Sequence, residues 1–128
     1  MRGLLTFVLA AALIGCAATS VREVTSKAPD GVFESKLKPR EVSACLLRTL
    51  EAADYPWGSV PALLQRDLVD ELQVIQQTGL SEMMGVYVVK PFGAGSRIAL
   101  YHSDAFYTGW ASRDRYNGIQ RQAASRCS

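Results

Sequence analysis

The sequence holds one histidine, His102, with Ser103 and Asp104 directly after it. Serine, histidine and aspartate are the residues of a nucleophilic relay, in which the histidine takes the proton of the serine hydroxyl. Neighbouring residues of a strand point to opposite faces, so these three side chains cannot form such a relay among themselves. We therefore expect no catalytic residue here and a protein that is not an enzyme.

Three cysteines, Cys16, Cys45 and Cys127, are the other residues that could do chemistry. A redox or metal site would require a C-x-x-C spacing or histidine companions. Neither surrounds Cys45 or Cys127, so we expect no metal ligands and no cofactor. Whether these thiols form a disulfide depends on the redox state of the compartment, and the N-terminal residues indicate which compartment that is.

The first residues have the pattern of a secretory signal. Residues 1–3 form a short segment that carries one basic residue, Arg2, and residues 4–13 form an apolar run of about ten residues. A membrane-spanning helix needs roughly 20 apolar residues. The apolar run ends at Ala18, before Thr19, Ser20 and Arg22, so the pattern predicts a leader rather than a spanning helix.

The leader ends in Leu13-Ile14-Gly15-Cys16, which resembles the lipobox of bacterial lipoproteins. The resemblance implies a signal peptide over residues 1–15, and a diacylglyceryl group and acyl chains such as palmitate on Cys16. One chain anchors a protein only marginally, whereas two or three hold it in the membrane. Aspartate after the cysteine would favour the inner membrane. Ala17 stands there, so the resemblance implies the outer membrane, with the protein facing the periplasm.

Export changes the expectation for the remaining cysteines. Cys45 and Cys127 form an even pair in an oxidising compartment, which predicts a disulfide.

Residues 16–38 are polar, with a turn at Pro29-Asp30-Gly31, and are expected to be a lipidated tether, free or loosely docked.

The domain then spans residues 39–128. Pro39 suits the first position of a helix, and apolar or small residues recur on one face of it: Val42, Cys45, Leu46, Thr49, Leu50 and Ala53. Residues 62–70 fit a strand or a short helix, and we favour the helix.

Three strands are expected over residues 71–77, 85–90 and 97–102, with a turn at residues 91–95. One face is aliphatic, and we place it against the helices; it consists of Leu72, Val74, Val86, Val88, Ile98 and Leu100. The opposite face carries Tyr87, Arg97 and Tyr101 and resembles a contact surface in composition, so it is the candidate partner surface.

A last helix is expected from about Ser112, with Tyr116, Ile119, Ala123 and Cys127 on one stripe. Both cysteines then point inward, as a bridge between two helices requires. The resulting fold class is α+β, a three-stranded antiparallel sheet flanked by an N-terminal and a C-terminal helix. The outer surface of the last helix carries candidate anion-binding residues: Arg113, Arg115, Arg121 and Arg126.

Over its whole length the chain looks like small proteobacterial outer-membrane lipoproteins, and more weakly like uncharacterised members with two cysteines around a small β-meander. We therefore predict a membrane-anchored, non-enzymatic module that binds an envelope protein. The alternative is a binder of lipopolysaccharide or peptidoglycan through the arginine helix, and a small hydrolase or hydrolase inhibitor ranks third. A net charge of +2 and export argue against nucleic acid.

Overall fold

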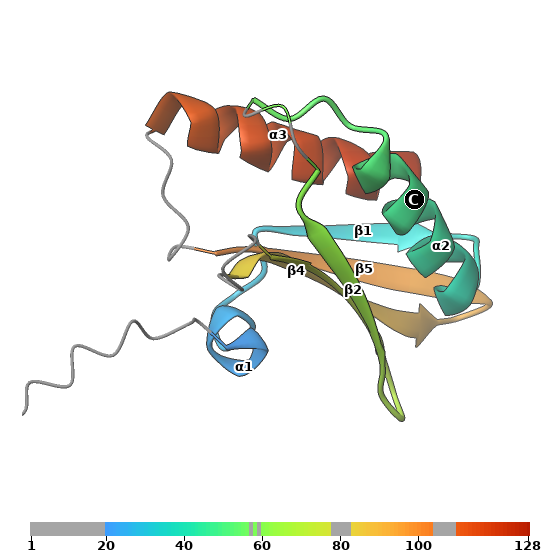
Figure 1. The fold of residues 1–128 in the computed structure, drawn as a ribbon. Helices are drawn as coiled ribbons and strands as arrows, with labels where there is room; N and C mark the ends of the chain where they lie inside the picture. The colour runs from blue at the N-terminus through green and yellow to red at the C-terminus, as the bar shows by residue number, and fades with distance from the viewer. Residues whose placement is uncertain (1–19, 57, 59, 78–82, 104–109) are drawn as a thin grey trace, which may run out of the picture.

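A computed structural model describes residues 20–56, 58, 60–77, 83–103 and 110–128, with the side chains of residues 110–112 excluded. Within this part of the chain, five antiparallel strands form one sheet in the order β1-β5-β4-β3-β2. The strands are β1 (Gly31–Ser35), β2 (Ala62–Asp67), β3 (Leu72–Gln77), β4 (Met83–Phe92) and β5 (Gly95–His102). Helices α2 (Pro39–Glu51) and α3 (Trp110–Arg126) lie on one face, and the short helix α1 (Val21–Val24) lies on the other (Figure 1).

The α+β class is confirmed, but the three-stranded sheet is wrong. Strand β1 comes from the segment expected to be the tether, and it pairs with β5 from Gly31 opposite Leu100 to Ser35 opposite Ser96. Strand β2 comes from the segment for which we favoured a helix, and it pairs with β3. Both are edge strands, which need no continuous apolar sequence because only one side of each is paired within the sheet.

Helix α2 begins at Pro39, as predicted. The backbone N–H of Lys38 donates to the Glu41 carboxylate at 3.0 Å, which caps the first turn. Val42, Leu46 and Leu50 are fully buried against the sheet. Helix α3 begins at Trp110, two residues before the expected start.

The side chains of strand β4 point to the opposite sheet faces from those we expected. A two-residue turn at Gly93 and Ala94 pairs Lys90 with Arg97 and Tyr87 with Leu100. Tyr87 and Val89 therefore face α2 and α3, whereas Val86 and Val88 face α1. Gly93 has a φ of 57°, a backbone conformation that glycine adopts without strain.

The sheet thus separates two apolar clusters. The larger cluster packs Leu72, Val74, Tyr87 and Ile98 against the two long helices. The smaller one packs Val24 of α1 against Ile75, Met83, Val86 and Val88. Helix α1 therefore belongs to the folded domain, and the chain is docked on the sheet well before Pro39.

Candidate functional site

Two cysteines join α2 to α3. The sulfur atoms of Cys45 and Cys127 lie 2.07 Å apart, the distance of a disulfide, and this is the pair predicted from the sequence. Cys127 is buried, and Thr49 Oγ1 lies 3.8 Å from its sulfur. In the part of the chain that the structure describes, no three His, Cys, Asp or Glu side chains gather as a metal site requires. Cys16 lies outside the described residues.

The structure divides the candidate partner surface between two faces. Tyr87 is fully buried under α3, where its hydroxyl donates to the Gln120 carbonyl at 2.9 Å. Arg97 and Tyr101 lie on the opposite face, and Arg97 is held between Glu34, at 3.3 Å, and the Phe92 ring, 3.7 Å from its centroid. The grouping of these three residues was therefore wrong, because the β4 register reverses the face of Tyr87.

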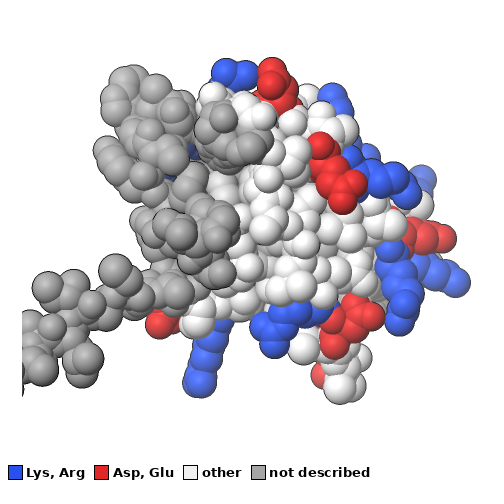
Figure 2. Space-filling model, in the orientation of Figure 1, with Lys and Arg blue, Asp and Glu red and all other residues white. Residues whose placement is uncertain are grey.

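The arginines of α3 do not share one surface. Arg115 pairs with Asp54 at 3.6 Å, and Arg121 donates to the backbone carbonyl of Asp30 at 2.8 Å. Arg126 lines a groove beside α2. Basic and acidic side chains alternate along the upper rim of the molecule, where Figure 1 places α3 (Figure 2).

A buried polar network holds α3 to the sheet, and the sequence analysis missed it. The Gln120 amide donates to Gln76 Oε1 and to the Tyr116 hydroxyl, each at 2.9 Å. Tyr116 donates to Gln76 Oε1 at 2.6 Å, and the Gln76 amide donates to the Tyr55 hydroxyl at 3.2 Å. Neutral glutamines with both donor and acceptor atoms satisfied are well suited to such an interior.

The network also explains a glycine. A Cβ at Gly85 would lie 2.0 Å from the Gln120 amide nitrogen, so only glycine leaves room for this side chain on β4. Burial raises the pKa of Tyr55 to about 12, and it raises the pKa of Tyr116 well above its ordinary value. Both phenols therefore remain neutral hydrogen-bond donors.

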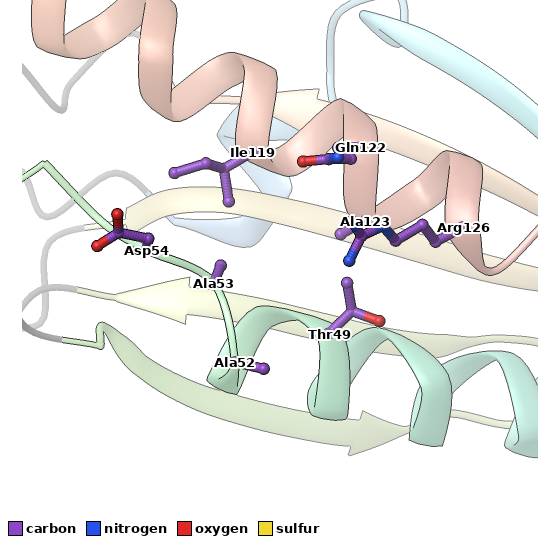
Figure 3. A pocket seen from close by; sticks show the side chains of 8 residues that line it. All are labelled: Thr49, Ala52, Ala53, Asp54, Ile119, Gln122, Ala123 and Arg126. Atoms are coloured by element: carbon purple, nitrogen blue, oxygen red, sulfur yellow. The ribbon is translucent and has the colours of Figure 1, made fainter.

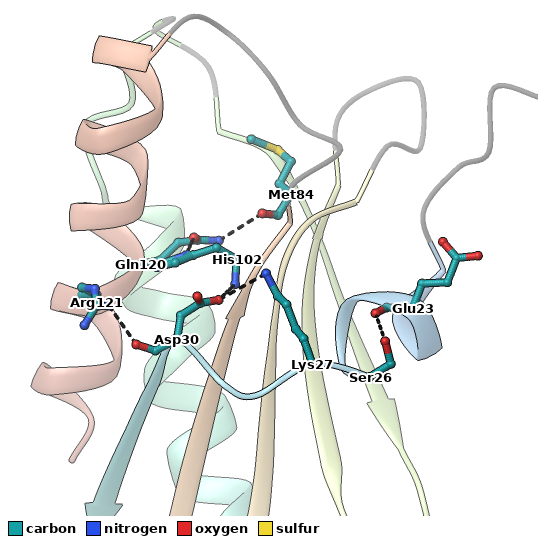
Figure 4. Close-up of polar contacts among 8 residues, drawn as sticks. All are labelled: Glu23, Ser26, Lys27, Asp30, Met84, His102, Gln120 and Arg121. Atoms are coloured by element: carbon teal, nitrogen blue, oxygen red, sulfur yellow. Dashed lines mark hydrogen bonds and ion pairs between the residues drawn. The ribbon is translucent and has the colours of Figure 1, made fainter.

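His102 closes the network at the end of β5 (Figure 4). The Gln120 amide nitrogen is used as a donor, so its Oε1 atom accepts a hydrogen bond from the N–H of His102 Nδ1 at 2.5 Å. The other ring nitrogen, Nε2, is buried and has no hydrogen-bond partner among the described residues. Ser103 is also buried, and Asp104 lies outside the described residues. The arrangement positions α3 against the sheet.

Acid is expected to destabilise the protein through His102. Burial lowers the pKa of His102 in the folded state, partly offset by Gln120 and Asp30, so the unfolded chain binds this proton more readily. The stabilising contribution is complete above the unfolded pKa of 6.5 and is lost as the pH falls through the lower folded value. Urea unfolding of wild type and His102→Asn between pH 8 and pH 5 measures the difference. Parallel curves for the two proteins would contradict this prediction.

A small groove separates the C-terminal end of α2 from α3. It encloses about 280 Å³, with Ala53 and Ile119 at one end and Thr49 facing Ala123 and Arg126 at the other (Figure 3). This is below the usual range of ligand pockets, about 300–1,000 Å³.

The edge of the sheet formed by β2 has stronger features of a binding surface. Strand β2 pairs only with β3 among the described strands, and five of its six residues are exposed. The turn that follows it, residues 68–71, projects beyond the sheet, with Val69 fully exposed and Leu68 42% exposed. Between this turn and the first residues of α2 lies a hollow of about 520 Å³, with Leu72, Val89 and Pro91 among the residues that line it. Unpaired backbone groups and apolar side chains thus lie side by side.

Comparisons with known proteins do not identify the chain. No protein-family model matches it, and no curated protein matches it significantly. None of the described helices is long and apolar enough to cross a membrane.

Proposed function

We propose that this protein is a lipid-anchored, non-enzymatic module of the outer membrane that faces the periplasm and binds a partner protein at the β2 edge. The lipobox and Ala17 support the anchor and its address. The exposed β2 edge is the observation that carries the binding function. An extended segment of a partner would add to the sheet through main-chain hydrogen bonds, the mode known as β-augmentation.

The apolar turn would supply the specificity of this contact. Leu68 and Val69 stand beside the hollow at the start of α2, so an apolar side chain of the added segment would be buried there. The ion pair between Arg40 and Asp67, 3.6 Å apart, borders the hollow and gives the site a polar rim. The arginines of α3 are a weaker candidate, because two of them contact neighbouring segments of the chain itself.

Site-specific photocrosslinking in cells tests this function. A photoreactive phenylalanine analogue at Val69 of the full lipidated chain is expected to give one discrete adduct, and Leu68→Asp in the same chain is expected to remove at least nine-tenths of it. The same analogue at Ser125, exposed on α3, is the matched control and should not give that adduct. An adduct of equal yield from both positions, or one that survives Leu68→Asp, would show that the partner does not use this edge.

A further inference from the structure

The distance between the lipid and the folded domain is short. Ser20 caps α1, since its hydroxyl accepts from the Glu23 backbone N–H at 3.2 Å. Val24 is 3% exposed and packs on the sheet, so the chain is docked at least from α1 onward, and Ser20 is its N-cap. Only four peptide units separate Cys16 from Ser20. An extended chain of this length spans at most roughly 14 Å, whatever its conformation.

The N-terminal segment that leads to Cys16 also leaves the domain on a defined side of the sheet. Helix α1 lies on the sheet face opposite α2 and α3 (Figure 1), and we call this the outer sheet face. Helix α1 covers the end of this face near Met83 and Tyr101. The remainder bears exposed apolar side chains: Val32 is 52% exposed, Leu64 46% and Phe92 43%. The strand register places Val32 opposite Ala99 and Leu64 opposite Ile75, both residues of the α1 side.

Basic side chains lie among these apolar ones. Arg66 pairs in register with Gln73, and Lys90 lies opposite Arg97, so all three cations rise from the outer sheet face. Two carboxylates, Glu34 and Glu71, accompany them. Long cationic side chains next to exposed apolar ones suit a lipid interface, where the apolar stems approach the acyl region and the charges reach the head groups.

We propose that the outer sheet face lies against an anionic lipid surface, with Val32, Leu64 and Phe92 at the contact. This inference rests on the proposed lipid anchor at Cys16. A tether of roughly 14 Å keeps the domain at the head groups, and the side on which α1 is docked selects the face that meets them. The β2 edge then lies close to the membrane plane, so a partner must present its segment there rather than deep in the periplasm.

Paramagnetic relaxation in nanodiscs tests this orientation. The lipidated mature chain is placed in discs that contain phosphatidylglycerol and a lipid with a gadolinium chelate on its head group, and methyl signals are compared with a diamagnetic lipid. The relaxation enhancement falls with the inverse sixth power of distance. We expect it to be several-fold larger at the Val32 and Leu64 methyls than at Ala52, which is exposed at the end of α2 on the other side. Equal enhancement at the three residues would overturn the proposal.

A matched pair of variants tests the role of charge. Lys90→Glu is expected to lower the enhancement at Val32 at least twofold, whereas Arg48→Glu, an exposed charge reversal on α2, should leave it unchanged. Equal effects of the two variants would contradict a specific basic contact. The mass of the N-terminal peptide of the same sample separates the two proposals. A bare Cys16 thiol would refute the anchor and with it this inference, whereas a lipidated Cys16 with uniform enhancement would refute the orientation alone.

Discussion

Replacing Cys16 is expected to move the protein from the membrane to the soluble periplasmic fraction almost completely. The variant carries Cys16→Ser together with an ordinary A-x-A cleavage site, so that the leader is still removed. Without acyl chains, only the outer sheet face would contact lipid. Several weak surface charges cannot replace two or three buried chains, each of which gains about 0.8 kcal/mol per CH₂. Fractionation at high salt, followed by immunoblotting, measures the change, because salt screens the remaining electrostatic contact.

The conservative variant Ala18→Ser is the control for this experiment. It changes a residue of the same segment and leaves Leu13-Ile14-Gly15-Cys16 intact, so it should remain with the membrane. A Cys16→Ser protein of mature mass that still sediments with membranes at high salt would contradict the lipid anchor.

Removing the disulfide is expected to have the largest effect on stability. The bridge between Cys45 and Cys127 closes a sequence separation of 82 residues. The loss of chain entropy in the unfolded state for such a loop corresponds to about 4–5 kcal/mol, as an upper value. Domains are generally stable by about 5–15 kcal/mol, so Cys45→Ala/Cys127→Ala is expected to lose a large share of its free energy of unfolding. Urea unfolding of the mature domain, followed by circular dichroism, measures this loss.

Reduced wild type is the control for the double variant. If the bridge itself provides the stability, dithiothreitol should bring wild type to the midpoint of the variant and leave the variant unchanged. A wild-type protein with the same urea midpoint in both redox states would contradict the prediction.

The helices and the central strands could be predicted because their signals are local. Pro39 marks the start of α2, and Val42, Leu46 and Leu50 recur with helical spacing along it. Strands β3, β4 and β5 lie where β-branched residues accumulate. The edge strands β1 and β2 gave no such signal. Most of their residues are exposed or half-buried, so neither strand shows a clean apolar alternation.

The face of β4 could not be predicted from its own residues. Residues 83–89 are all buried, so apolar side chains point to both sides and alternation does not choose between them. The register chooses, through the two-residue turn after Phe92 on one side and the pairing of Leu72 with Val89 on the other. A shift of one residue reverses every side chain, and for this reason Tyr87 was assigned to the wrong face.

The binding surface and the polar network likewise depend on contacts between distant segments. Gln76 and Gln120 are polar residues with no local pattern, and they become partners only when α3 packs on the sheet. The β2 edge is free only because the sheet order leaves it last.

By itself the sequence determined the resemblance to a lipoprotein leader, the α+β class, and the two cysteines that face each other. Each of these follows from residue types and from their spacing over short segments. These local signals do not depend on the tertiary structure. The tertiary structure alone decided the five-stranded order, the register of β4, the docking of residues 20–35 and hence the short reach from Cys16. Those features arise from pairing between strands far apart in the chain, where hydrogen bonding and burial select one arrangement among several that the local sequence permits.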